Sequence, residues 1–285
     1  MNRLKMKWLL YGSRGWLGSQ FSNFLREKFP HIILLTSDKR VDDIDTINEE
    51  LDELKPDRVI CFIGRTSGPG CNTIDYLEGP GKLVENIRDN LFAPVLLMKL
   101  CEDHGIHCTY LGTGCIFSYN DPNDPPFVEH SKPNFTGSSY STVKGFTDQL
   151  AGLFTALNVR IRMPITSKDE PKNLLSKMIR YPKVCNTLNS VSVLDDIFPV
   201  LVLLILEEYN GTVNLVNPGP IDHVTILELY KKYVDPNHTY TLMEESEQNN
   251  MLQSKRAKNT MKPTFKSIRT AKESIERIFQ TFIKV

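Results

Sequence analysis

The fold of this chain is decided by the stretch Lys7-Trp8-Leu9-Leu10-Tyr11-Gly12-Ser13-Arg14-Gly15-Trp16-Leu17-Gly18. A short apolar run leads into a loop with three glycines, and the residues after the loop have the periodicity of a helix. Glycines at a strand-to-helix turn let a pyrophosphate approach the N–H groups of the helix N-terminus. The residues from Gly12 to Gly18 are therefore predicted to bind a dinucleotide. A plain tight connection is the less favoured alternative.

Strands and helices alternate in the rest of the first half. Apolar runs at 32–36, 58–63, 109–111 and 159–162 predict strands, and residues 44–54, 83–103 and 140–157 predict helices. Pro94 must kink the second of these helices or mark its first turn. Strands that are apolar throughout and separated by helices are typical of a parallel sheet covered on both faces. The fold class is therefore α/β, a doubly wound parallel sheet of the Rossmann type.

The pattern is looser in the second half. Helices are expected at 173–180, 197–208, 226–233 and 271–284, and a strand is expected at 212–216. We interpret residues 1–164 as a Rossmann domain that binds the cofactor. Residues 165–285 are interpreted as a smaller lobe for the substrate, with segments around 192–217 returning to the sheet.

Composition excludes several classes of function. The 285 residues include 34 basic and 34 acidic side chains, a balance that argues against binding to nucleic acid or an anionic membrane. The best candidate for a membrane span, 197–206, contains Pro199 and falls short of the required length of about 20 apolar residues. Six cysteines without a CxxC pair, and no secretory leader, predict reduced thiols, a cytoplasmic location and no metal site.

The residues after the second strand bear on the choice of cofactor. Asp38, Lys39 and Arg40 stand there, and Arg14 lies in the glycine loop. A carboxylate at this place binds the ribose diol of NAD, whereas cations accommodate the 2′-phosphate of NADP. Three cations against one carboxylate favour NADPH, with Arg40 as the phosphate ligand. A solvated turn explains Lys39 equally well.

Two short segments carry candidate chemistry, Gly112-Thr113-Gly114-Cys115 and Tyr140-Ser141-Thr142-Val143-Lys144. Tyr and Lys at this spacing lie one turn apart on the same face of a helix. A nearby ammonium lowers the pKa of a phenol from about 10, which makes the phenol a proton donor near neutral pH. Thr113 adds a hydroxyl. Residue chemistry alone leaves Cys115 open between a second acid/base and a buried, inert thiol.

The glycine loop, Thr113 and the pair Tyr140 and Lys144 resemble the extended short-chain dehydrogenase/reductases. A closer resemblance is to the nucleotide-rhamnose synthase/epimerase-reductase family, which is related to dTDP-4-dehydrorhamnose reductase. This resemblance covers nearly the whole chain and rests on residues 112–117, 132–141, 160–165 and 180–184. It implies a bifunctional 3,5-epimerase/4-keto-reductase that converts UDP-4-keto-6-deoxy-D-glucose to UDP-L-rhamnose with NADPH.

The resemblance also implies roles for individual residues. Cys115 is the base that removes the protons at C3 and C5, and Lys183 is the acid on the opposite face, with Lys177 as the fallback. Thr113 and Tyr140 bind the developing oxyanion. Tyr140 then protonates the C4 oxygen during reduction, and Lys144 binds the nicotinamide ribose and lowers the pKa of the phenol. The residues implied to contact the cofactor also include Gly64, Asn90 and Met163, and those implied to contact the substrate also include Thr66, Phe117 and Asn173.

Relatives of this fold often form homodimers by packing two long helices from each subunit. Residues 83–103 and 140–157 are the corresponding helices here, although their outward faces are not clearly apolar in the sequence. The expected partners are therefore a UDP-sugar or dTDP-sugar substrate and a second copy of the chain.

The chain departs from the family pattern at the end of the third strand. Cys61-Phe62-Ile63-Gly64 stands where the family usually has Asn-Ala-Ala-Gly, and a thiol cannot replace the hydrogen bonds of an amide. The following loop, 65–82, is longer than expected, and its Asp75 and Glu78 match a family pair only loosely. These departures affect the expected contacts to cofactor and substrate.

Three alternatives stay open. The first is a reductase that acts on an already epimerised sugar. The second is a non-catalytic relative that binds the cofactor, and the third is a dehydratase for the preceding step. Intact Thr113, Tyr140 and Lys144 argue against the second. A dehydratase needs an acidic pair beside the catalytic threonine, where this chain has Gly114 and Cys115.

Overall fold

The computed structural model describes residues 6–119, 121, 123–250 and 259–281. These residues form two compact units, and each is described by itself. The first unit comprises residues 1–112, 142–159 and 201–212, and the second comprises 113–141, 160–200 and 213–285. The chain passes between the units several times, so neither unit is one continuous segment. The boundary predicted after residue 164 stays a prediction.

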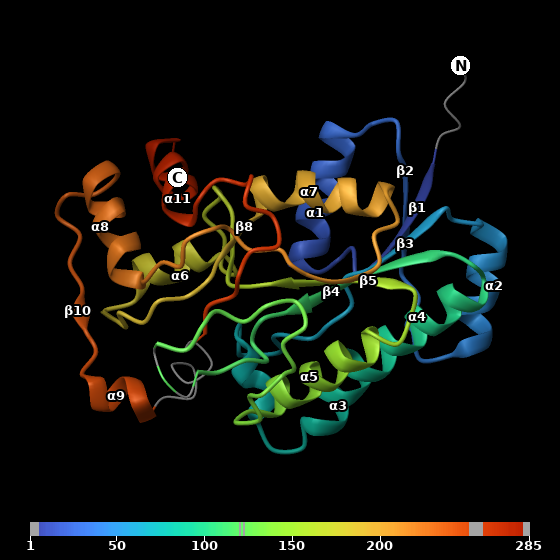
Figure 1. The fold of residues 1–285 in the computed structure, drawn as a ribbon, viewed down its shortest axis with the longest axis horizontal. Coiled ribbons are helices and arrows are strands. Elements are labelled where there is room, and N and C mark those ends of the chain that lie inside the picture. The colour runs from blue at the N-terminus through green and yellow to red at the C-terminus, as the bar shows by residue number, and fades with distance from the viewer. Residues whose placement is uncertain (1–5, 120, 122, 251–258, 282–285) are drawn as a thin grey trace. The chain divides into compact units, whose positions relative to one another are not determined.

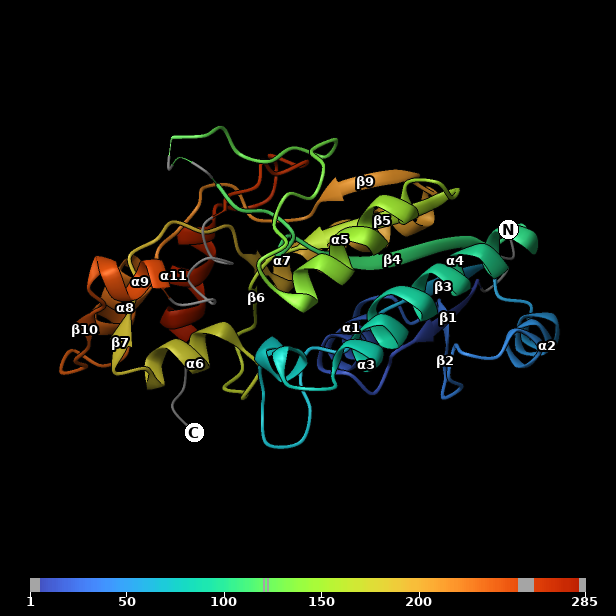
Figure 2. The ribbon, with the colours of Figure 1, turned by 90° about the horizontal axis from the view of Figure 1, so that it is seen from below.

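A six-stranded sheet forms the centre of the first unit (Figure 1). Its strands run in the order β2 (Ile33–Ser37), β1 (Lys7–Tyr11), β3 (Arg58–Cys61), β4 (His107–Thr113), β5 (Ala156–Ile161) and β9 (Gly211–Asn214). β1 pairs in parallel with β2 and β3, and β3 pairs in parallel with β4. Helices cover both faces, with α1 (Trp16–Lys28) and α7 (Leu194–Leu206) on one and α4 (Ala93–Asp103) and α5 (Ser139–Ala151) on the other (Figure 2). The predicted doubly wound parallel sheet is confirmed.

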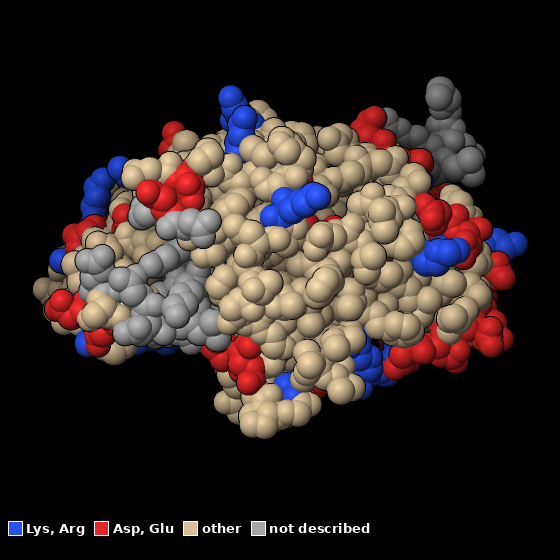
Figure 3. Space-filling model, turned by 60° about the horizontal axis from the view of Figure 1, so that its bottom comes forward, with Lys and Arg blue, Asp and Glu red and all other residues tan. Residues whose placement is uncertain are grey.

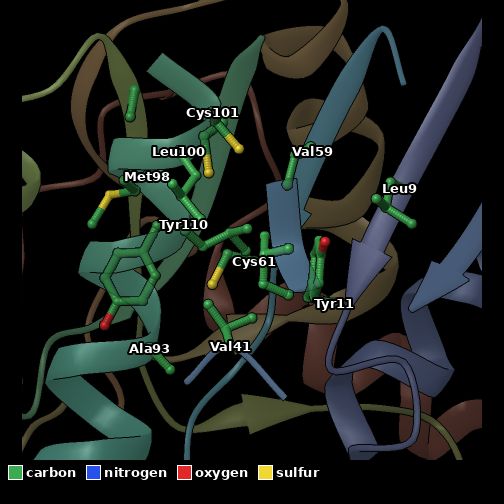
Figure 4. Packing of buried hydrophobic residues seen from close by; sticks show 14 of the residues in the cluster. Leu9, Tyr11, Val41, Val59, Cys61, Ala93, Met98, Leu100, Cys101 and Tyr110 are labelled. Carbon is green, nitrogen blue, oxygen red and sulfur yellow. The ribbon is translucent and has the colours of Figure 1, made fainter. Parts of the chain in front are cut away.

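The core beneath α4 is built from side chains that the strands direct to one face. The register places Tyr11 beside Cys61 and Cys61 beside Tyr110, and Figure 4 shows these three residues on neighbouring strands. Apolar residues of α4 and of α2 (Ile44–Leu54) pack over them. Burial raises the pKa of the Cys61 thiol, so this departure from the family pattern is an inert, protonated core residue.

The long helix expected at 83–103 is interrupted by a wider turn. α3 (Leu83–Ile87) leads into a π-helical segment, Arg88–Phe92, before α4 begins with Pro94 in its first turn. Pro94 has no N–H to donate to the carbonyl of Asn90, four residues earlier. The hydroxyl of Thr147 on α5 donates to this carbonyl instead, at 2.6 Å. The proline therefore marks the first turn of α4. The π-segment carries Asn90, and such segments are frequent at functional sites.

Other expected boundaries change as well. The helix expected at 140–157 ends at Ala151, because residues from Ala156 onward belong to strand β5. The chain turns at Gly152. Apolar residues on both sides of this turn continue the helical periodicity, so the sequence predicts one longer helix. The strand expected at 58–63 ends at Cys61. The last helix, α11 (Ala271–Thr281), has the expected start, and the rest of the expected range lies outside the described residues.

The loop 65–82 is ordered by its own contacts and contains a 3-10 helix, Ile74–Glu78. A Cβ on Gly68 would lie 2.2 Å from the ring of Tyr76, so the backbone approaches this ring more closely than any other residue allows. Lys82 donates to the Tyr76 phenol at 2.5 Å and to Glu85 at 3.1 Å.

The second unit has its own core and two small parallel sheets. β6 (Pro164–Ile165) pairs with β8 (Ser192–Val193), and β7 (Lys183–Val184) pairs with β10 (Thr241–Leu242). The helices of this unit are α6 (Leu174–Arg180), α8 (His223–Tyr233), α9 (Glu245–Asn250) and α11. α11 packs against α8 and β8, and α6 packs against α8. Across the described ranges, no helix combines the length and the apolar character that a bilayer span requires.

Candidate active site

The glycine loop of the first unit is shaped for close approach to a phosphate. Gly12 has φ +82°, and a Cβ there would lie 2.6 Å from the carbonyl oxygen of Phe62. A Cβ on Gly18 would lie 2.2 Å from the carbonyl oxygen of Gly12. Gly15 is the N-cap of α1 without a side-chain hydrogen bond, and the first turn of α1 has no acidic residue. Neither a capping side chain nor an acidic residue occupies the N-terminus of α1, which suits it to bind an anion such as the pyrophosphate of a dinucleotide.

At the end of β2, Arg40 is exposed but already paired. It donates to Asp42 at 2.9 Å and to Asp89 at 3.4 Å. Asp89 also accepts a hydrogen bond from Arg65 at 2.6 Å. Burial raises the pKa of Asp89, but hydrogen bonds from Arg88 and Arg65 hold it below its usual value. A 2′-phosphate at this place would therefore compete with two carboxylates for Arg40. The side chain of Lys39 is exposed at the same turn.

Lys144 lies in the core of the first unit, where Tyr110 contacts its ammonium group. It donates to the phenol oxygen of Tyr110 and lies 4.6 Å from the centre of that ring. A Cβ on Gly64 would lie 3.9 Å from Nζ of Lys144 and 3.1 Å from Oδ1 of Asn90. Gly64 thus keeps the backbone open beside two residues predicted to contact the cofactor.

Asn90 is fully buried, and the described hydrogen bonds of its side-chain amide are made to other residues of this protein. Its Oδ1 accepts from the N–H of Arg65 at 2.9 Å, and its Nδ2 donates to the Arg65 carbonyl at 3.0 Å and to Asn86 at 2.9 Å. The residue therefore joins the π-segment to the end of the third strand. Its predicted cofactor contact stays a prediction.

Helix α5 carries Tyr140 and Lys144 one turn apart, as the spacing predicts. Its N-terminus is capped by Ser138, whose Oγ accepts from the N–H of Ser141 at 3.1 Å and donates to its hydroxyl at 2.9 Å. Tyr140 and Lys144 are both 5% exposed, so each holds its functional group in a largely dry environment.

In the second unit, the segment Thr113-Gly114-Cys115 forms a tight turn at the end of β4. The N–H of Cys115 donates to the hydroxyl oxygen of Thr113 at 3.1 Å, which leaves the threonine O–H to donate elsewhere. The N–H of Gly114 donates to the carbonyl of Ile161 at 2.9 Å. Cys115 is partly exposed and carries a free thiol.

A buried arginine contacts this thiol. Arg162 follows β5, is 2% exposed, and donates from Nη1 to Sγ of Cys115 at 2.6 Å. Its Nη2 donates to Oδ1 of Asn189 at 2.9 Å. A Cβ on Gly114 would lie 3.3 Å from Cδ of Arg162 and 2.2 Å from Sδ of Met261. The second glycine of the Gly-Thr-Gly-Cys segment therefore makes room for Arg162 and Met261.

The remaining predicted residues have diverse surroundings. Phe117 is fully buried and stacks on Phe127 with ring centres 4.4 Å apart, whereas Thr66 is exposed in the first unit. Met163 has φ +42°, an uncommon conformation for a residue with a side chain and one that clusters at functional sites. The predicted roles of these three residues stay predictions.

Asn173 and the candidate acids have contacts of their own in the second unit. Asn173 caps α6 and donates from its amide to the carbonyls of Thr166 at 2.8 Å and Lys168 at 2.7 Å. Lys183 is exposed and pairs with Glu247 at 2.9 Å, a contact that lowers the pKa of this carboxyl. The fallback, Lys177, is partly buried on α6. The sequence-based roles of Asn173 and Lys183 also stay predictions.

Sequence reasoning missed Arg162, Tyr110 and Thr147. A signal for Arg162 was available, because Arg160 and Arg162 alternate in an otherwise apolar strand and so face the same side of it. A charged side chain in a buried strand requires a partner. Tyr110 and Thr147 left no such signal, since their contacts depend on how β4 and α5 pack.

Comparison with known proteins identifies the family. No family model matches the chain. It is 44% identical over 261 residues to protein L780 of Acanthamoeba polyphaga mimivirus, covering 90% of each chain. A crystal structure of L780, described as a UDP-rhamnose synthase, superposes with a TM-score of 0.91 at 40% identity over 97% of this chain and 99% of that one.

Two further relatives agree with this result. A bifunctional dTDP-4-dehydrorhamnose 3,5-epimerase/reductase of Arabidopsis thaliana is 31% identical over 279 residues, 94% of this chain and 90% of the relative. The dTDP-4-dehydrorhamnose reductase of Bacillus anthracis, solved with NADP, has a TM-score of 0.81 at 17% identity over 97% of this chain and 99% of that one, a likeness of fold. The chain belongs to the nucleotide-rhamnose synthase/epimerase-reductase family.

Proposed function

We propose that this chain is an NADPH-dependent 3,5-epimerase/4-keto-reductase that converts UDP-4-keto-6-deoxy-D-glucose to UDP-L-rhamnose. The observation that carries the proposal is the turn after β4, where Cys115 follows Thr113 by two residues and contacts the buried guanidinium of Arg162. A reductase alone needs Thr113, Tyr140 and Lys144. A thiol beside a buried cation suits a second task, the removal of a proton from carbon.

The relatives support this assignment. L780 is described as a UDP-rhamnose synthase, and the Arabidopsis relative as an epimerase and reductase of a dTDP sugar. The name of L780, the more similar of the two, favours UDP as the nucleotide of the substrate.

Epimerisation is assigned to the second unit. The C4 ketone acidifies the hydrogens at C3 and C5, and the Cys115 thiolate takes each proton while the C–H electron pair forms an enolate. The hydroxyls of Thr113 and Tyr140 stabilise the enolate oxygen. A proton then returns to the opposite face of each carbon. Lys183 is the proposed donor, which requires it to leave its ion pair with Glu247.

Reduction is assigned to helix α5. Bound NADPH supplies the hydride for C4, and the glycine loop, Gly64, Asn90, Arg40 and Lys144 are the residues that would hold it. Tyr140 donates its phenol proton to the C4 oxygen. The positive charge of Lys144, one helical turn away, favours the phenolate that this step leaves behind.

The proposal is tested with purified protein, NADPH and UDP-4-keto-6-deoxy-D-glucose, by following NADPH oxidation and identifying the product. UDP-L-rhamnose is expected, and the absence of NADPH oxidation contradicts the proposal. The Cys115→Ser variant distinguishes the proposed enzyme from a reductase without epimerase activity. A reductase that acts only on an already epimerised sugar keeps its activity in this variant. A non-catalytic relative binds NADPH without turnover.

We further propose that the chain forms a homodimer through α3, α4 and α5. The helices and the π-segment between them expose large apolar side chains, and the face of the molecule in Figure 3 carries few charges over much of its area. These exposed residues are Leu83, Val84 and Ile87 of α3, Phe92 of the π-segment and Phe146 of α5, joined by Leu153 in the turn after α5. Light scattering after gel filtration is expected to give twice the chain mass. Phe146→Glu combined with Leu153→Glu should give the monomer, and a wild-type monomer contradicts the proposal.

A cytoplasmic location is proposed as well. All six cysteines are free thiols, as expected in a reducing compartment. Fractionation of cells that express the tagged chain would test the location.

A further inference from the structure

Arg162 occupies a site that the second unit builds around it. Its guanidinium contacts Cys115 through one terminal nitrogen and Asn189 through the other, and its backbone N–H donates to the Ser192 hydroxyl at 3.0 Å. The residue is 2% exposed. A buried guanidinium keeps its charge, and it needs an acceptor that compensates its loss of water. A thiolate is a better acceptor for this purpose than a neutral thiol.

The backbone of the cysteine turn is held by hydrogen bonds from another segment. Asn259 donates from its amide to the carbonyls of Gly114, at 3.3 Å, and Phe117, at 3.0 Å. Met261, which lies next to Gly114, is fixed by a hydrogen bond from its N–H to Ser190 at 2.8 Å. The Asn259 side chain thus fixes the backbone of the turn that carries Cys115.

The other charged groups on the surrounding segments have separate contacts. Arg160 lies over the Phe117 ring at 5.0 Å and donates to backbone carbonyls, including that of Glu129 at 3.0 Å. The Glu129 carboxylate accepts from Thr264 at 2.6 Å. Lys262, Lys132, His130 and Tyr119 are further charged or titratable residues of these described segments. Among them, Arg162 is the group that the structure places in hydrogen-bond contact with Sγ.

We propose that Arg162 is a positioning residue that holds the Cys115 sulfur as a thiolate and aims it, so that Cys115 serves as the base for epimerisation. This inference rests on the proposed epimerase function. Arg162 keeps all its protons throughout. The thiolate gains the proton from C3 or C5, the C–H electron pair passes into the enolate, and the S–H proton leaves to solvent before the next step.

The first experiment measures the ionisation of Cys115 directly in the wild-type protein. The rate of Cys115 alkylation by iodoacetamide is followed across pH by mass spectrometry of the peptide that contains it. A free thiol ionises at about pH 8.5, and a cation in contact lowers the midpoint by about one unit or more. A wild-type midpoint equal to that of a synthetic peptide with residues 110–118 overturns the inference, and this arm needs no variant.

The second experiment uses Arg162→Gln, with Arg180→Gln as the matched control. Arg180 is an exposed arginine of the same unit that pairs with Asp169 at 2.9 Å. In Arg162→Gln the alkylation midpoint should rise by about one unit, and deuterium uptake from solvent at C3 and C5 should fall by about tenfold or more. Reduction of the already epimerised 4-keto sugar should stay within about threefold, which a general loss of structure would not allow. Arg180→Gln should resemble wild type.

The outcomes separate this inference from the proposed function. An Arg162→Gln variant that is alkylated with the wild-type pH profile overturns the inference, even if the wild-type protein epimerises the sugar. A wild-type protein that takes up no deuterium at C3 or C5 overturns the epimerase function. In that case a raised midpoint in Arg162→Gln still supports the contact between the guanidinium and the thiolate.

Discussion

The ammonium group of Lys144 donates a hydrogen bond to the Tyr110 phenol and lies 4.6 Å from the centre of the same ring. Tyr110 is fully buried on β4, so the strand fixes the position of a lysine on the adjacent helix. This hydrogen bond restricts the ammonium group. Lys144 is therefore placed before any cofactor arrives.

Tyr110→Phe is expected to slow reduction. The variant keeps the ring and loses the oxygen that accepts from Lys144, which corresponds to about 1.5 kcal/mol or about tenfold in rate. Steady-state NADPH oxidation measures the effect. Tyr233→Phe is the control, because the Tyr233 phenol donates to Glu276 on the outer helices of the second unit. Equal rates in the two variants contradict a positioning role for Tyr110.

Thr147→Val is expected to destabilise the first unit. The hydroxyl of Thr147 supplies the Asn90 carbonyl with the hydrogen bond that Pro94 cannot make. A buried acceptor that loses its donor costs about 1 to 3 kcal/mol in the free energy of unfolding, measurable by urea denaturation. Thr281→Val is the control, since its hydroxyl bonds only to helix carbonyls at the exposed end of α11 in the described chain. A cost no greater than that of the control would remove this account of the π-segment.

Gly12→Ala is expected to weaken NADPH binding and to lower the melting temperature. A methyl group there meets the Phe62 carbonyl at 2.6 Å in a backbone conformation of φ +82° that alanine rarely adopts. Gly81→Ala separates the two effects, because Gly81 has φ +73° but open space around its Cβ position. Gly81→Ala should show the strain alone, a loss of about 1 to 2 kcal/mol with unchanged NADPH affinity. If Gly12→Ala matches Gly81→Ala in both measurements, the predicted phosphate loop is not supported.

Asp89→Asn is expected to change how stability depends on pH. The pKa of Asp89 is held low in the folded protein by Arg88 and Arg65, although its burial acts in the opposite direction. The stabilisation is therefore fully present above the unfolded pKa of about 3.9 and is lost as the pH falls through the lower folded value. At neutral pH the variant should be less stable by about 1 kcal/mol, and the difference should shrink below about pH 4. Melting temperatures measured between these pH values test this, and a constant difference contradicts it.

Much of the fold could be predicted because its signals are local. The glycine loop and the apolar strands are each recognisable within a few residues, and β1 and α2 have the expected bounds. The end of α5 could not be predicted in this way, because Gly152 separates two apolar segments that share one periodicity. Pro94 predicts a kink or a first turn, yet only the packing of Thr147 shows how the lost hydrogen bond is replaced.

The site was predictable where spacing along one element determines the geometry. Tyr140 and Lys144 lie on one helix, and Thr113 and Cys115 share one turn, so the short spacing within each pair determines its local geometry. Arg162 reaches Cys115 from the segment after β5, a contact across 47 positions that no local pattern encodes. Asn173 shows the opposite case, because an asparagine at the start of a helical pattern is also the signal for an N-cap, and the structure shows that cap.

The central claim is that one chain both inverts C3 and C5 and reduces C4. It is tested most directly by incubating the purified protein with UDP-4-keto-6-deoxy-D-glucose and NADPH in deuterated water and analysing the product by NMR and mass spectrometry. The account predicts UDP-L-rhamnose with deuterium at both C3 and C5, and no such product from Cys115→Ser. A reduced sugar that retains the starting configuration and the original hydrogens at both carbons would contradict it.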